Sequence, residues 1–103
     1  MYSVVFLVKK KAGMTQAEFA RFWIEDHTPF TAKVTGIRSY LVYPFHDGQT
    51  GPFDGAAVIS FDDKESCDRA LASAEFKAAL ADAINFQTID ETISFTADEF
   101  RIV

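Results

Sequence analysis

The chain has 103 residues, of which 49 % are hydrophobic and 24 % are charged, a balance that suits one globular domain over residues 1–103 and argues against disorder. Its net charge of -5 provides little basic surface for phosphates, so we expect neither nucleic-acid binding nor attraction to an anionic membrane. Cys67 is the only cysteine, which excludes an intrachain disulfide and favours a reducing compartment, expected to be the cytoplasm.

The first apolar segment, residues 2–9, predicts a strand that is buried on both faces. Its apolar side chains fall on both alternating sets, with Tyr2, Val4, Phe6 and Val8 on one and Val5 and Leu7 on the other. The segment is too short to cross a bilayer and lacks the features of a signal peptide. The chain's own helices can cover one face, so we expect a second subunit to cover the other.

A helix is predicted to begin at Thr15, an N-cap residue with Glu18 at the capping-box position. An apolar stripe at helical spacing follows and includes a histidine: Phe19, Phe22, Trp23, His27 and Phe30. Pro29 disfavours a helical conformation at Thr28 and lacks an amide donor. The helix should therefore kink or restart near Thr28, with Pro29 in its first turn.

The rest of the chain predicts three more strands and a split helix. The strands are expected at residues 37–43, 55–61 and 91–102, with a loop at residues 46–52. Asp62 or Asp63 caps a short helix, and Ser73 caps the next one. The order β-α-β-β-α-β predicts an α+β, ferredoxin-like fold with an antiparallel four-stranded sheet. The apolar second face of that sheet predicts a sheet-to-sheet homodimer.

His27 is the first candidate for chemistry. An unperturbed imidazole has a pKa of about 6.5, so near neutral pH it can act as a general acid or a general base. The alternative is a structural histidine that caps the helix end and bonds a backbone carbonyl. Asp26 or Glu25 would be the local choice to orient it, but neighbours in sequence do not face each other on a helix.

Aromatic residues supply the other candidates, because 11 phenylalanines exceed what a small core needs. Phe19, Phe22, Trp23 and Phe30 are expected to form the wall of a substrate pocket or a subunit interface, with plain core packing as the alternative. Tyr40 and Tyr43 lie on opposite faces of their predicted strand. Either phenol can donate a hydrogen bond in a pocket, and either can serve only as a core aromatic.

Metal and nucleotide chemistry find little support in the sequence. His27, His46 and Cys67 do not match the spacing of a metal site, and no glycine-rich phosphate loop is present. We therefore expect no metal and no cofactor.

Several short motifs in order resemble the EthD-type domain family, which belongs to the dimeric α/β-barrel superfamily and takes its name from a protein of ethyl tert-butyl ether degradation. The motifs cover nearly the whole chain: Phe6-Leu7-Val8-Lys9-Lys10 with Gly13-Met14-Thr15, Glu18-Phe19 with Phe22-Trp23, His27-Thr28-Pro29, Gly36-Ile37-Arg38-Ser39-Tyr40, Phe53-Asp54-Gly55-Ala56-Ala57 and Phe61-Asp62.

The resemblance implies a homodimer whose two sheets form a barrel, with a pocket between sheet and helices in each subunit. It also places His27 at the family's His-x-Pro position. Relatives in the superfamily include cofactor-free monooxygenases, lactone isomerases, polyketide-tailoring enzymes and haem-binding proteins, and the EthD group is associated with oxidoreductase and degradative roles. Fold similarity does not select among these reactions.

Three functional hypotheses follow. The first is a cofactor-free oxidoreductase, isomerase or dehydratase that acts on a hydrophobic oxygenated or aromatic metabolite, with His27 as acid or base and Tyr40 or Tyr43 positioning an oxygen. The second is a non-catalytic module that binds a hydrophobic ligand, and the third is an accessory dimer of a degradation pathway. An open cavity shared by His27 and a tyrosine would favour the enzyme, whereas a cavity filled by Phe19 and Phe22 would favour the accessory dimer.

Overall fold

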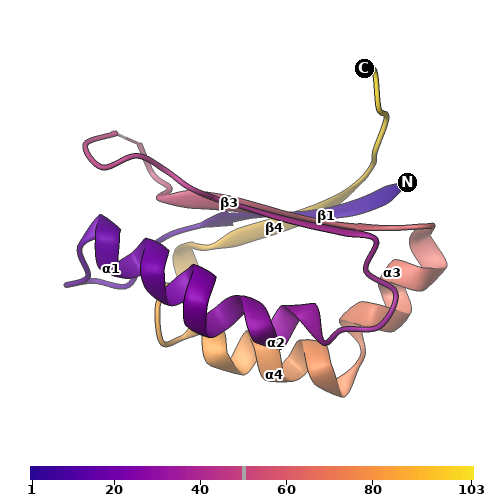
Figure 1. Cartoon of the computed structure of the whole chain (residues 1–103), viewed down its shortest axis with the longest axis horizontal. Coiled ribbons are helices and arrows are strands. Elements are labelled where there is room, and N and C mark those ends of the chain that lie inside the picture. Colours follow the sequence, from indigo (N-terminus) through magenta and orange to yellow (C-terminus); the bar gives the residue numbers. More distant parts are fainter. Residues whose placement is uncertain (50) are drawn as a thin grey trace.

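The computed structural model describes residues 1–49 and 51–103, so Thr50 of the predicted loop lies outside the described residues. Four strands form the sheet: β1 (Tyr2–Val8), β2 (Ser39–Pro44), β3 (Gly55–Phe61) and β4 (Ile93–Asp98). All neighbouring strands are antiparallel, and the spatial order is β2-β3-β1-β4. The helices lie on one side of this sheet (Figure 1). The predicted ferredoxin-like α+β fold is therefore confirmed.

The first helical segment consists of three consecutive elements: α1 (Gln16–Arg21), the π-helix η1 (Phe22–His27) and α2 (Thr28–Ala32). Both bonds of the predicted capping box are present. The Glu18 amide donates to Thr15 Oγ1 at 3.1 Å, and the Thr15 amide donates to Glu18 Oε1 at 2.8 Å. α2 begins at Thr28 with Pro29 in its first turn, as the sequence predicts. Thr28 itself keeps helical backbone angles, φ -56° and ψ -31°, contrary to the expectation from Pro29.

The second helical segment is split into α3 (Lys64–Leu71) and α4 (Ala74–Ala83), which are capped by Asp63 and Ser73 as predicted. A short 3-10 turn, η2 (Ile89–Glu91), leads into β4. The predicted last strand, 91–102, is too long at both ends. Its register with β1 ends where Tyr2 lies opposite Asp98, and beyond that pair the Glu99 amide donates to the Met1 carbonyl at 2.7 Å.

The core between sheet and helices is divided into two clusters. One contains Val4, Val34, Ile59, Phe61, Cys67, Ala70 and Phe76, and the other contains Val8, Phe19, Trp23, Ala57, Ala83 and Phe86. Phe6 and Tyr40 are only partly buried and pack against both clusters. The space between the clusters is therefore bordered by two aromatic side chains that project from the sheet.

The other face of the sheet is covered by none of the helices among the described residues (Figure 1). Leu41, Tyr43 and Phe95 share this face, because each is paired in register with a neighbour on it, and about half of each side chain is exposed. β1 is thus apolar toward both faces, as its sequence predicts. Within the described residues, none of the helices combines the length and the apolar character required to span a bilayer.

Candidate functional site

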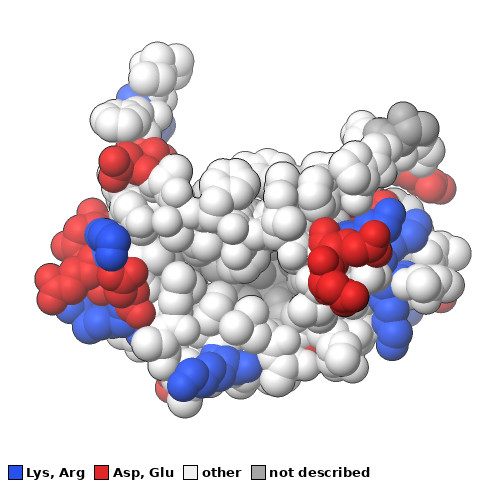
Figure 2. Space-filling model, turned by 180° about the vertical axis from the view of Figure 1, so that it is seen from behind, with Lys and Arg blue, Asp and Glu red and all other residues white. Residues whose placement is uncertain are grey.

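A cavity of about 200 Å³ lies between the sheet and the helices. Its inner end is formed by the nearly fully buried residues Trp23, His27 and Thr31. Its outer rim includes Leu80 and Ile89, which are about half exposed. The space-filling view shows the molecule hollowed between sheet and helices, with uncharged residues around the hollow and charged residues to either side and below (Figure 2). The site thus has an apolar entrance and a buried interior.

His27, at the end of η1, is held by a carboxylate from the other helical segment. Its Nδ1 lies 2.8 Å from Oδ2 of Asp82 on α4, and both side chains are almost fully buried. A carboxylate only accepts hydrogen bonds, so the proton of this contact resides on Nδ1. In the neutral form of the ring, Nε2 is then unprotonated and faces the cavity, which is the form required of a base. Asn85 Nδ2 donates to Asp82 Oδ1 at 3.0 Å and orients the carboxylate.

Phe86 supports the imidazole from behind. Its ring centroid lies 4.7 Å from that of His27, and its side chain is fully buried. The rings of Phe19, Phe22 and Trp23 also pack on Phe86, with centroids 5.5–5.8 Å away. This cluster limits the rotamers open to His27, so the direction of Nε2 is set by packing as well as by Asp82.

The π-helix places Trp23 and His27 on the buried face together. The Thr28 amide donates to the carbonyl of Trp23, five residues earlier, and thereby leaves the Ile24 carbonyl without its usual partner. The Thr28 hydroxyl donates to that carbonyl at 2.6 Å. Pro29 has no amide to restore the regular pattern. The Thr28-Pro29 pair therefore stabilises the local widening that directs His27 into the cavity.

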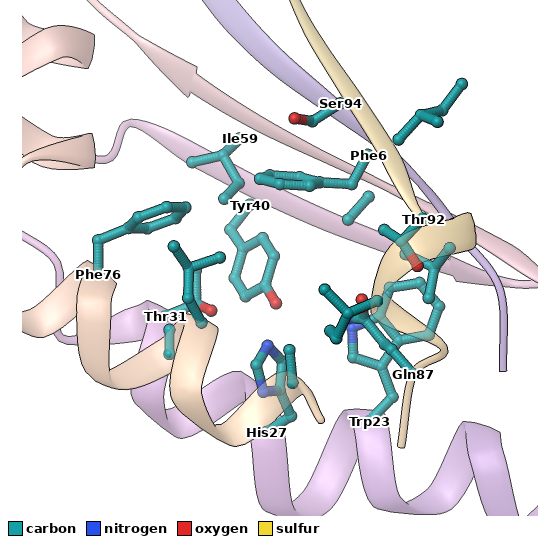
Figure 3. A pocket seen from close by; sticks show the side chains of 17 residues that line it. Phe6, Trp23, His27, Thr31, Tyr40, Ile59, Phe76, Gln87, Thr92 and Ser94 are labelled. Atoms are coloured by element: carbon teal, nitrogen blue, oxygen red, sulfur yellow. The ribbon is translucent and has the colours of Figure 1, made fainter. Parts of the chain in front are cut away.

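Tyr40 enters the cavity from β2, opposite His27. The close view shows Tyr40 reaching from the sheet toward His27, with Trp23 beside them (Figure 3). Burial raises the pKa of the Tyr40 phenol above its ordinary value, while the nearby Thr31 hydroxyl and Trp23 indole act in the opposite direction. Tyr40 therefore stays protonated at neutral pH and can donate a hydrogen bond.

Comparison with known proteins agrees with this architecture. The family model of the EthD domain matches residues 11–90. The chain belongs to the EthD domain family. This assignment confirms the resemblance found in the sequence. No curated protein matches this EthD domain with significance.

Solved structures share the fold of this EthD domain over nearly its full length. An ethyl tert-butyl ether degradation (EthD) family protein from Bacillus halodurans has a TM-score of 0.76 at 24 % identity, covering 97 % of this chain and 100 % of that one. HapK from Hahella chejuensis has a TM-score of 0.72 at 10 % identity, covering 97 % and 93 %. A dimeric ferredoxin-like protein of unknown function from Thermobifida fusca has a TM-score of 0.73 at 14 % identity, covering 93 % and 88 %.

The residues singled out from the sequence occupy different places in the EthD domain. His27, Tyr40 and Trp23 line the same cavity. Phe19 and Phe22 lie behind it, against Phe86, and are not part of its lining. Two further candidates are remote from it. Phe30 is partly exposed beside Lys33, and Tyr43 lies on the opposite, open face of the sheet.

Asp82, Phe86 and Thr31 are the site residues that sequence reasoning missed. Asp82 lies in the last turn of α4, where a carboxylate looks like part of a solvated face, and Phe86 follows that helix. The contact between α4 and η1 exists only in the folded chain, so no local spacing indicates it. Asp26, the local alternative to Asp82, is exposed and has no contact with His27 among the described hydrogen bonds and ion pairs.

Proposed function

We propose that this EthD domain is a cofactor-free enzyme that transfers a proton on a small hydrophobic, oxygenated metabolite. The observation that carries the proposal is the His27 imidazole, fixed through Nδ1 by Asp82 while Nε2 faces the cavity. A base oriented by a third group is the arrangement that general acid–base catalysis uses. The Asp82 carboxylate also stabilises the imidazolium that forms when Nε2 accepts a proton.

The proposed step starts at a C–H bond next to a carbonyl group. His27 Nε2 takes the proton, and the C–H electron pair moves to the carbonyl oxygen to form an enolate. The Tyr40 hydroxyl donates a hydrogen bond to that oxygen, which is strengthened because the site is shielded from water. In a β,γ-unsaturated substrate the enolate is extended over the C=C bond, so the imidazolium can return the proton to the γ-carbon and move the double bond into conjugation. In a saturated ketone or lactone the proton returns to the same carbon, which gives exchange without isomerisation. Oxidation from the same enolate would require dioxygen as the oxidant.

Deuterium uptake by neutral cyclic ketones and lactones in D₂O, followed by NMR, tests the proposal. We expect wild-type protein to exceed the buffer rate, and His27→Ala to reduce the excess by about 10²-fold or more. His46→Ala is a matched control, because His46 is the other histidine and lies exposed in a loop. Equal rates in wild type and His27→Ala, or no excess over buffer with any compound, would refute the proposal.

The two non-catalytic hypotheses have less support. An accessory dimer with a closed pocket is disfavoured because Phe19 and Phe22 pack behind the cavity and do not fill it. A ligand-binding module would need the cavity but would not need a carboxylate placed against the imidazole. A buried carboxylate and its partner carry a desolvation penalty, which is hard to explain in a pocket that only binds an apolar ligand.

We also propose that the open face of the sheet pairs with a second copy of this chain. Leu41, Tyr43 and Phe95 are half exposed on one continuous apolar surface, which monomeric proteins rarely leave open. The similar structures from Thermobifida fusca and from Bacteroides fragilis are described as dimeric. Two sheets packed face to face would form the barrel that the sequence resemblance implies.

A further inference from the structure

We infer that the ligand of the cavity is a neutral, single-ring compound with one carbonyl oxygen, bound with that oxygen at the inner end. The inference rests on the proposed function for its choice of a carbonyl over an alcohol. The neutral charge, the orientation and the size of the ligand are argued from the charge, polarity and size of the lining.

The charge of the lining argues for a neutral ligand. Among the described residues that line the cavity, none is a lysine, arginine, aspartate or glutamate. Behind the wall, the carboxylate of Asp82 lies 2.8 Å from His27 Nδ1. An anionic ligand would thus meet no free cation and would lie near a negative group, and a cationic ligand would lose its hydration without a direct partner.

The distribution of polar groups in the cavity determines how the ligand is oriented within it. The walls and the rim are mainly hydrocarbon, from Phe6, Ile59, Phe76, Leu80 and Ile89. Tyr40, Trp23, Thr31 and His27 converge at the inner end (Figure 3). Gln87, Thr92 and Ser94 add further polar groups elsewhere in the lining. A ligand that is apolar at one end and carries oxygen at the other matches this gradient, because its ring stays in the apolar part and its oxygen reaches the donors.

Hydrogen-bond roles at the inner end favour a carbonyl over an alcohol. The Tyr40 phenol is protonated at neutral pH and supplies a donor, and the Trp23 indole lies close to the Tyr40 oxygen and helps to hold that phenol in place. A carbonyl oxygen has lone pairs and no proton, so it can accept from Tyr40. His27 Nε2 is then left free for the neighbouring C–H group. An alcohol would donate its own proton to Nε2 and occupy the base.

The volume limits the ligand to about one ring. The cavity measures about 200 Å³. An engineered apolar cavity of about 150 Å³ holds a benzene molecule. A six-membered ring with a carbonyl and one or two small substituents fits such a space, whereas a compound with three fused rings does not, unless the lining opens.

Trp23 provides a direct probe of binding, because it is the only tryptophan of the chain and lies in the cavity wall. Fluorescence titrations compare three compounds of one ring size: cyclohexanone, cyclohexanecarboxylate and methylcyclohexane. We expect cyclohexanone to bind at least tenfold more tightly than the carboxylate. Tyr40→Phe should weaken cyclohexanone about five- to tenfold and leave methylcyclohexane unchanged. Tyr43→Phe, on the opposite face, is the matched control.

Tighter binding of the carboxylate, or no binding of cyclohexanone at millimolar concentration, would overturn the inference. So would equal affinity of cyclohexanone and methylcyclohexane. These comparisons use wild-type protein, so they remain decisive if Tyr40→Phe does not fold. Binding of cyclohexanone without deuterium uptake by any ketone would refute the proposed proton transfer and leave the ligand class intact. The two failures are therefore distinguishable.

Discussion

Asp82 and His27 lie 55 positions apart in the sequence, yet Asp82 Oδ2 is 2.8 Å from His27 Nδ1. Asp82 comes from the last turn of α4, and His27 comes from the end of η1. The contact joins the two helical segments beneath the sheet and fixes both the orientation and the tautomer of the imidazole. Asp82 is thus a positioning residue, because it acts through His27 and does not line the cavity.

Asp82→Asn should lower turnover in the deuterium-uptake assay by about 10²-fold or more with little change in shape. Asn85 donates to Asp82 Oδ1, so the new amide should keep its oxygen there and turn its NH₂ group toward His27 Nδ1. An NH₂ group is a donor, so the proton of the imidazole would move to Nε2, where it blocks the base.

Nitrogen-15 NMR of the imidazole measures this tautomer directly, and a purely structural role for Asp82 would leave it unchanged. Asp26→Asn is the matched control, because Asp26 adjoins His27 in sequence but is exposed. An unchanged tautomer in Asp82→Asn, or an equal loss of activity in Asp26→Asn, would show that Asp82 does not position His27.

Gly55→Ala should destabilise the fold by about 1–3 kcal/mol, because it overpacks the wall of the cavity. A Cβ at Gly55 would clash with Cζ3 of the Trp23 ring and lie 3.0 Å from the Tyr43 carbonyl oxygen. The ring is buried and held by Phe86, so it has little room to move. Thermal and denaturant unfolding measure the loss, and a shift in Trp23 emission should accompany it.

A double-mutant cycle assigns this effect to the Trp23 ring. Trp23→Phe removes the atoms nearest to the new Cβ, so Gly55→Ala should cost much less in that background. If Gly55→Ala lowers the free energy of unfolding equally in wild type and in Trp23→Phe, the backbone contact with Tyr43 dominates and Gly55 does not make room for Trp23.

The sequence predicted those parts of the fold that depend on local chemistry. Thr15 and Glu18 form the capping box because both partners lie within one turn, and Pro29 forces the restart because it lacks an amide. The alternation in β1 indicated two apolar faces. The length of β4 was predicted less well because strand ends depend on the partner, and the register of β4 against β1 ends at the pair of Tyr2 and Asp98.

Within the site, the sequence indicated His27, Tyr40 and Trp23 but could not separate cavity wall from supporting core. Phe19 and Phe22 share the helical stripe with Trp23, yet only depth along the folded helix decides which ring reaches the open space. The periodicity of apolar residues indicates which face of a helix is buried, but it does not indicate whether a side chain on that face reaches the cavity. The same limit applies to Asp82, because its role depends on a contact between two helical segments.

Stability at alkaline pH should depend on Tyr40. Burial raises its folded-state pKa above the ordinary value of 10.0. Its contribution to stability is therefore fully present below the unfolded pKa and is lost as pH rises through the folded pKa. The free energy of unfolding of wild type should fall more steeply above about pH 10 than that of Tyr40→Phe. Tyr43→Phe retains Tyr40 and should follow wild type, and parallel curves for wild type and Tyr40→Phe would contradict the expected effect.

The open face of the sheet gives a prediction about assembly. Phe95→Lys places a charge among the half-exposed Leu41 and Tyr43 of that face, so it should convert a dimer into a monomer at micromolar concentration. Ile84→Lys is the matched control, because Ile84 is also apolar and 63 % exposed but follows α4 on the helical side. Sedimentation velocity measures both variants. A wild-type monomer, or a monomer produced by Ile84→Lys and not by Phe95→Lys, would mean that the sheet face is not the contact surface between two copies.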